Sequence, residues 1–273
     1  MKDEGLGVDR ISRVFRKGGR AALMPYFTIG YPDYETSLDV IAACCKAGAD
    51  LMELGVPFSD PLADGPTIQR STQIALEGGI TVSRCLQAVR ELRGHGVETP
   101  FLLMGYINPV LSYGLERFAR EAAEAGVDGF IVPDLPPDEA GTFSAHCTGH
   151  GLGLVFLVAP NSTPERITLV VERSNPFVYL VSLTGVTGGR TSLPANLATF
   201  IDNVATFNPE GKPLAVGFGI ATGEQAAAVG KVADGVIVGS ALIDAVARAV
   251  DAGESPAEAA GRFVGELKHA ILF

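Results

Sequence analysis

Tryptophan is absent from the 273-residue sequence, and basic residues are scarce, with 21 Lys and Arg against 31 Asp and Glu and a net charge of −10. No run of basic residues offers the positive surface that binds nucleic acid or an anionic membrane. No apolar run reaches the roughly 18 to 20 residues of a membrane span. The first fifteen residues, MKDEGLGVDRISRVF, are charged and helix-like, unlike a secretory signal. We therefore predict a cytoplasmic protein with neither nucleic acid nor membrane as a partner.

Cysteine is also scarce. The four cysteines contain no C-x-x-C pair and lie in segments that resemble helices, which argues against disulfide and zinc frameworks. We expect reduced, buried thiols at Cys44, Cys45, Cys85 and Cys147.

Eight short apolar runs bounded by Gly, Pro or Asp alternate with segments that carry Ala, Glu, Leu and Arg at helical spacing. The runs begin near residues 21, 49, 100, 129, 152, 177, 213 and 235. This alternation is typical of parallel strands joined by helices, and the length suits a single α/β barrel. We predict one (β/α)8 (TIM) barrel domain over residues 1–273, with an extra N-terminal helix at about residues 6 to 17. The alternative is an open doubly wound sheet, which needs a G-x-G-x-x-G turn after the first strand, and the segment 28–32 is not one.

Helix boundaries carry recognisable signals. Asp33, Thr81, Thr222 and the Ser162-Thr163 pair stand where helices are predicted to begin, and their side chains can accept the first free backbone N–H groups. Glycine accounts for 33 residues, and many glycines stand where a helix is predicted to end. The predicted stops include Gly48, Gly126 and Gly151.

Lysine and histidine are missing from the catalytic end of the predicted barrel, which is the C-terminal end of its strands. None of the six lysines ends a strand, as a Schiff-base aldolase or a pyridoxal enzyme requires. His146 and His150 share a helix face, but no third ligand is nearby, so we predict no metal site. With lysine and metal chemistry disfavoured, we predict acid–base catalysis by carboxyl groups.

Glu53 is an acidic residue in an otherwise apolar strand, close to the catalytic end. Burial of a carboxylate costs free energy, which favours a functional role for one in this position. We therefore predict that Glu53 is a general acid or base with a raised pKa. The alternative is a structural Glu held by a neighbouring donor. The next loop, residues 57–67, contains three prolines and two aspartates and can present Asp60 and Asp64 over the barrel. One of the two aspartates is expected to be only a turn residue.

Glycine-rich turns follow the seventh and eighth predicted strands, at Gly217-Phe218-Gly219 and at Gly239-Ser240. A helix begins after the second turn, and this combination is the usual phosphate site of such barrels. Close packing of strand and helix would also explain the glycines. The Gly- and Thr-rich segment 182–190 is long enough to form a lid.

Several of these motifs together resemble the tryptophan synthase α-subunit family. The matching motifs are the run from Glu53 to Gln69, Val132-Pro133-Asp134-Leu135-Pro136, Thr184-Gly185-Val186-Thr187-Gly188, Gly217-Phe218-Gly219-Ile220 and Gly239-Ser240-Ala241. They occur in the family's order from about residue 20 to 245. Met104-Gly105-Tyr106-Ile107-Asn108-Pro109 follows the family's third strand end only loosely.

The resemblance implies retro-aldol cleavage of indole-3-glycerol phosphate to indole and glyceraldehyde 3-phosphate. It implies that Glu53 is the general acid–base and that Asp64 accepts the indole N–H. It further implies a substrate site made of Tyr26, Tyr179, Thr187, Gly188, Gly217, Phe218, Gly219, Gly239 and Ser240. For Tyr26, packing in the barrel is an equal alternative.

The resemblance also implies a partner, a pyridoxal-phosphate β subunit in an α2β2 heterotetramer, with no cofactor in this chain. Pro57 and Asp60 would lie at that interface, and the segment 134–137 would be a second contact. Two alternatives stay open. One is a stand-alone lyase that releases free indole, and the other is a non-catalytic allosteric subunit, against which the intact Glu53 and Asp64 argue.

Overall fold

The computed structural model describes residues 6–16, 19–181, 197–217 and 219–272, and its strands are all parallel. The hydrogen-bonded order of the strands is β5-β4-β3-β2-β1-β9-β8-β7-β6. The strands are β1 (Ala22–Thr28), β2 (Met52–Gly55), β3 (Phe101–Met104), β4 (Gly129–Ile131), β5 (Gly153–Val155), β6 (Leu157–Val158), β7 (Val178–Val181), β8 (Leu214–Gly217) and β9 (Gly235–Val238).

The fifth predicted strand is divided into β5 and β6 at a single residue, Phe156. Its backbone N–H donates to the Ser174 hydroxyl at 3.1 Å, while its carbonyl accepts from Tyr179 N at 3.1 Å. The ladder is interrupted there because one backbone group is satisfied by a side chain. Since β5 and β6 are the two ends of the sheet order, this one residue brings those ends together, and the predicted (β/α)8 barrel is confirmed.

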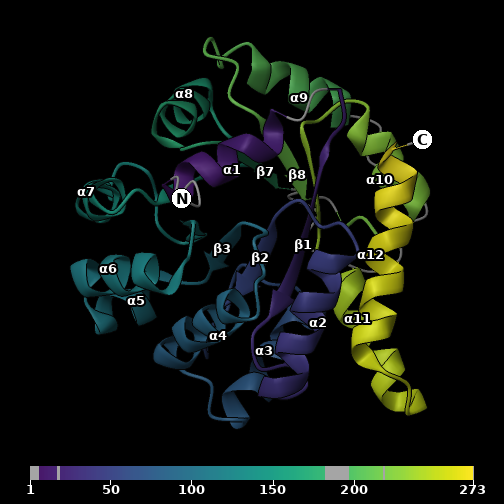
Figure 1. Ribbon diagram of the computed structural model, residues 1–273. Coiled ribbons are helices and arrows are strands. Elements are labelled where there is room, and N and C mark those ends of the chain that lie inside the picture. Colours follow the sequence, from purple (N-terminus) through teal and green to yellow (C-terminus); the bar gives the residue numbers. More distant parts are fainter. Residues whose placement is uncertain (1–5, 17–18, 182–196, 218, 273) are drawn as a thin grey trace.

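Helices form a ring around the strands (Figure 1). They are α1 (Gly7–Phe15), α2 (Tyr34–Lys46), α3 (Pro66–Glu77), α4 (Val82–Gly94), α5 (Ile107–Tyr113), α6 (Leu115–Ala125), α7 (Gly141–Gly149), α8 (Pro164–Arg173), α9 (Leu197–Ala205), α10 (Gly223–Gly230), α11 (Ser240–Ala252) and α12 (Pro256–Leu272). The predicted caps are confirmed at Asp33, Thr81, Thr163 and Thr222, whose side chains accept backbone N–H groups. Ser162 instead accepts from Ala159 N at 3.0 Å, so Thr163 is the cap.

Two apolar cores hold the barrel. One lies between the strands and the surrounding helices. The other fills the interior of the barrel, around Met24, Leu102 and Phe177. Of the predicted buried thiols, three are buried and Cys45 is half-buried, and burial raises the pKa of the Cys45 thiol to about 11. No helix formed by the described residues is long and apolar enough to span a bilayer.

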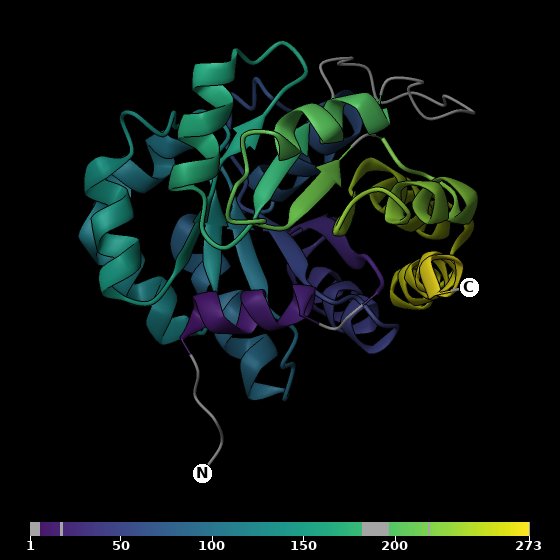
Figure 2. The ribbon, with the colours of Figure 1, turned by 90° about the horizontal axis from the view of Figure 1, so that it is seen from above.

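Helix α1 lies across the end of the barrel where the strands begin (Figure 2). Its Ile11 and Val14 are buried and belong to the inner core, because the helix places both on the face turned toward the strands. Val8 N also donates to Gly151 O at 3.0 Å, just before β5. The predicted N-terminal helix is thus present, two residues shorter at its end than expected, and it seals the inner core from water.

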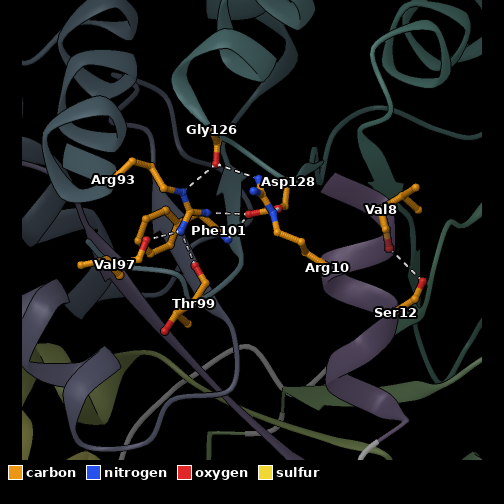
Figure 3. Close-up of polar contacts among 9 residues, drawn as sticks. All are labelled: Val8, Arg10, Ser12, Arg93, Val97, Thr99, Phe101, Gly126 and Asp128. Atoms are coloured by element: carbon orange, nitrogen blue, oxygen red, sulfur yellow. Dashed lines mark hydrogen bonds and ion pairs between the residues drawn. The ribbon is translucent and has the colours of Figure 1, made fainter. Parts of the chain in front are cut away.

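A buried ion cluster fastens α1 to the barrel (Figure 3). The fully buried Asp128 accepts from Arg10 Nε, from Arg93 Nη2 at 2.8 Å and from Phe101 N at 2.7 Å. Arg93 also donates to the carbonyls of Val97, Thr99 and Gly126, so its buried charge is well satisfied. The cluster therefore joins α1, α4 and the start of β4.

Asp128→Ala is expected to lower the free energy of unfolding by about 3–5 kcal/mol, because it leaves the half-buried Arg93 and Arg10 without their shared carboxylate. Urea unfolding followed by far-UV circular dichroism measures the loss. Asp138→Ala is the matched control, because Asp138 pairs with Arg166 at 2.9 Å on the surface. That variant should unfold close to the wild type. Equal unfolding midpoints for the two variants would contradict the role of the cluster.

Candidate active site

Glu53 lies in β2, fully buried, near the end of the barrel where the strands finish, which we call the mouth. Its Cα is paired in register with Tyr26 of β1 and Leu102 of β3. Neither carboxylate oxygen has a hydrogen-bond partner among the described residues. Burial alone raises the pKa of Glu53 well above its ordinary value of 4.5. The side chain is therefore biased toward its neutral form, and no donor among the described residues holds it as the structural alternative requires.

Asp64 lies over the mouth in the loop between β2 and α3 and is partly buried. Burial raises its pKa to about 6, although the Tyr106 hydroxyl, which donates to Oδ2 at 3.1 Å, favours the charged form. The same Tyr106 oxygen accepts from Ala63 N at 2.9 Å, so one tyrosine fixes both the carboxylate and the loop backbone. Two carboxyl groups with raised pKa values thus lie at one end of the barrel, a common feature of catalytic sites.

A pocket opens between Asp64 and the strand ends. It is lined by Tyr26, Val56, Phe58, Pro61, Asp64, Thr72, Met104, Gly105, Tyr106 and Pro133. Most of these side chains are apolar or aromatic, with a single carboxylate among them. Such a lining matches an aromatic ligand that carries one N–H donor, but the cavity measures only about 10 Å³, so it must widen to admit one.

The predicted aromatic residues Tyr26 and Tyr179 are both buried, at 6% and 7% exposure. For Tyr179, in β7, burial first and then the charges of Glu53 and Asp64 raise the pKa well above its ordinary value of 10. These effects show that Tyr179 lies near both carboxyl groups, and they keep its hydroxyl neutral. Tyr26 packs in the barrel, with its hydroxyl 3.4 Å from that of Thr28, and it also lines the pocket, so both roles predicted for it stay open.

The predicted phosphate glycines lie at the same end of the barrel. Gly217 ends β8, and a Cβ there would stand 2.7 Å from the Tyr179 hydroxyl, so glycine is needed for close packing. Gly219 has φ +65°, a conformation that side chains disfavour, and no atom lies within 4 Å of its added Cβ. Gly239 precedes α11, whose first residue is Ser240. Three glycines and a helix N-terminus are therefore near one another in the fold, while Gly217 also serves packing.

Thr187, Gly188, Phe218 and the predicted lid, residues 182–190, lie outside the described residues. For the interface pair, the structure places Asp60 at the surface and Pro57 in the interior. Ser59 Oγ donates to Asp60 at 2.5 Å.

Tyr106 contacts the candidate site but was not among the predicted site residues. It stands two residues after the end of β3, so the rule that working residues follow strand ends could have found it. The sequence also did not predict the buried contact between the hydroxyls of Thr28 and Ser71, because no sequence spacing indicates it. Within the described part of the chain, no three His, Cys, Asp or Glu side chains gather as a metal site would need.

The fold and the carboxyl groups at its mouth place the chain among the (β/α)8-barrel enzymes. The family model described as "Tryptophan synthase alpha chain" matches residues 13–272. Among curated relatives, the tryptophan synthase alpha chain of Chloroflexus aggregans is 51% identical over 244 residues, 88% of this chain and 91% of that protein. The alpha chain of Chloroflexus aurantiacus is 48% identical over 267 residues, 97% and 99% of the two chains.

Solved structures agree with these relatives. Tryptophan synthase subunit alpha from Legionella pneumophila superposes with a TM-score of 0.89 at 38% identity, over 97% of this chain and 98% of that chain. Mycobacterium tuberculosis tryptophan synthase gives a TM-score of 0.88 at 40% identity, over 99% and 100%. The chain belongs to the tryptophan synthase alpha chain family.

Proposed function

We propose that this chain cleaves indole-3-glycerol phosphate to indole and glyceraldehyde 3-phosphate and passes the indole to a β subunit for tryptophan synthesis. The observation that carries the proposal is Glu53, buried without a hydrogen-bond partner among the described residues and sharing the barrel mouth with Asp64. Such a carboxyl group is a proton carrier kept in its neutral form until a substrate arrives.

In the proposed reaction, protonated Glu53 delivers its proton to C3 of the indole ring. Positive charge then builds on the ring nitrogen, and the Asp64 carboxylate accepts the N–H and stabilises that charge. Glu53, now a carboxylate, takes the proton from the hydroxyl on the carbon attached to C3. The bond between C3 and that carbon breaks, the carbon becomes the aldehyde of glyceraldehyde 3-phosphate, and the electron pair restores the aromatic ring. Glu53 ends the cycle protonated, as it began.

The phosphate is proposed to rest on the backbone at Gly217, Gly219, Gly239 and Ser240. The free N–H groups and the dipole at the start of α11 stabilise a dianion without basic side chains. Thr187 and Gly188 are proposed to complete this cradle and Phe218 to line the indole slot beside Tyr26 and Tyr179.

Gly239→Val is expected to raise the KM for indole-3-glycerol phosphate roughly tenfold, since about 1.4 kcal/mol of lost phosphate binding corresponds to that factor. An added Cβ there lies 3.5 Å from Tyr26, an ordinary contact, and circular dichroism checks that the variant with its larger side chain is folded. Gly141→Val is the control, because Gly141 also begins a helix, α7, and has open space around it. Steady-state kinetics of indole release checks both variants. An unchanged KM in Gly239→Val would remove Gly239 from the phosphate site.

The partner is proposed to be a tryptophan synthase β subunit, in an α2β2 heterotetramer located in the cytoplasm. Pyridoxal phosphate belongs to that partner, and this chain needs no cofactor of its own. Asp60 and the neighbouring Leu62, whose side chain is 93% exposed, favour a docking surface on the loop after β2. Pro57 is buried, so its part at the interface is to stiffen this loop.

Indole release from indole-3-glycerol phosphate, measured with the isolated chain and then with a β subunit, tests the function. We expect slow release alone and a marked increase with the partner. A full rate without the partner would favour the stand-alone lyase. No release in either case would favour the non-catalytic subunit.

A further inference from the structure

A short chain of buried hydroxyl groups connects the pocket wall to helix α3. The Thr28 hydroxyl, at the end of β1, lies 2.7 Å from the Ser71 hydroxyl of α3, and both residues are fully buried. On its other side Thr28 lies 3.4 Å from the hydroxyl of Tyr26, which lines the pocket. This buried polar contact joins α3 to the barrel wall.

Ser71 also forms a hydrogen bond within its own helix. Ser71 Oγ donates to the carbonyl of Ile68 at 2.8 Å, and a hydroxyl has a single proton to give. When that proton goes to Ile68, Thr28 donates to Ser71, and either oxygen can donate in the 3.4 Å pair of Tyr26 and Thr28. The 2.7 Å contact between Thr28 and Ser71 therefore ties α3 to β1 at one position.

Helix α3 in turn carries Asp64. The helix begins at Pro66, two residues after Asp64, and Gln69 Nε2 of its first turn donates to the Asp64 carbonyl at 2.9 Å. Asp64 therefore has a side-chain tether, Tyr106, and a main-chain tether through α3. A small shift of α3 along β1 moves the second tether and with it the carboxylate.

We propose that Ser71 and Thr28 are positioning residues of the lyase reaction, which hold α3 in register with β1 and so keep the Asp64 carboxylate where the indole N–H must meet it. The catalytic part of this inference rests on the proposed function, whereas the positioning of the Asp64 carboxylate by the two hydroxyls can be tested without it. An Ala and a Val would fill the same space, so packing alone does not require the two hydroxyls, whereas a fixed register does.

The first test is kinetic. Ser71→Ala and Thr28→Val should each lower kcat for indole release about tenfold with less than a twofold change in KM, the scale of one buried hydrogen bond converted to rate. Thr28→Ser, which keeps the hydroxyl, should restore kcat to near the wild-type value. Ser174→Ala is the matched control: Ser174 is also buried and hydrogen-bonded, but it caps the end of α8, before β7 begins, at the far end of the barrel. Its kcat should not change.

The decisive test is a double variant that combines Ser71→Ala with Asp64→Asn. If Ser71 acts through the Asp64 carboxylate, Ser71→Ala should add less than a twofold loss once that carboxylate is gone. A further tenfold loss there would overturn the proposal, as would failure of Thr28→Ser to restore kcat or an equal loss in Ser174→Ala.

A second readout needs no activity. Carbon NMR of the Asp64 carboxyl group should show a shifted titration in Ser71→Ala relative to the wild type, because the carboxylate moves against its surroundings. The titratable groups that interact with it are Tyr106 after β3, Tyr26 of β1 and Tyr179 of β7. If the wild-type chain with a β subunit released no indole, the proposed function would fail, and this titration would still decide the inference. An unmoved titration overturns it.

Discussion

Glu53→Gln is expected to lower kcat for indole release by roughly 10³-fold, within the range that a positioned general acid–base contributes. Gln has the shape of Glu but carries no transferable proton, so C3 of the indole ring is not protonated. Affinity should be kept, because the neutral Glu53 and the amide present a similar surface to the substrate. Calorimetric binding of indole-3-glycerol phosphate to this nearly inactive variant measures that affinity. Retained turnover would exclude the acid–base role. Glu77→Gln, on the exposed face of α3, is the control and should cleave at the wild-type rate.

The same substitution should change the pH dependence of stability. Above pH 4.5 an unfolded chain has lost the Glu53 proton, while the folded chain keeps it up to its raised pKa. The unfolded state thus binds fewer protons, and wild-type stability attributable to this group falls as pH rises, by about 1.4 kcal/mol per pH unit. The Glu53→Gln variant has no such loss, because its amide does not titrate. Urea unfolding should therefore show that the free energy of unfolding of the variant, relative to that of the wild type, is higher at pH 8 than at pH 5. The same difference at both pH values would contradict the raised pKa.

Asp64→Asn is expected to lower kcat/KM by roughly 10²-fold, the scale of one lost electrostatic contact to a transition state. Asn can still accept from Tyr106 and keeps the loop in place, so the loss is incomplete. In the wild type, kcat/KM should fall on the acid side of about pH 6, where Asp64 becomes protonated, and this limb should be absent from the variant. Indole release measured from pH 5 to 8 checks both points. An unchanged rate at pH 7.5 would exclude charge stabilisation by Asp64.

Much of the barrel could be predicted from local patterns. Strands covered on both faces are apolar in every position, and helix caps depend on side chains two or three residues from the backbone they serve. Asp33 and Thr222 were recognisable for this reason. The break at Phe156 was not, because it depends on Ser174, which comes from a later part of the chain.

In the candidate site, too, some features could be predicted from the local sequence and others depend on distant residues. Glu53 stood out because an acid inside an apolar strand violates the local pattern, and the structure confirms that it is buried. Asp60 and Asp64 were harder to separate, since both lie beside turn-forming residues. The fold separates them, leaving Asp60 at the surface and placing Asp64 against Tyr106.

By itself, the sequence determined the barrel class and singled out Glu53 and Asp64 as candidates, because composition, short spacings and motifs carry that information. Only the tertiary structure decided how each group is tuned. The raised pKa of Glu53 depends on its burial, which requires the neighbouring strands β1 and β3. The tethers of Asp64 depend on Tyr106, 42 residues away in the chain, and the anchor of α3 depends on Thr28, 43 residues from Ser71. Hydrogen bonding and desolvation act over a few ångströms in space, whatever the distance along the chain, so these properties arise only when the barrel closes.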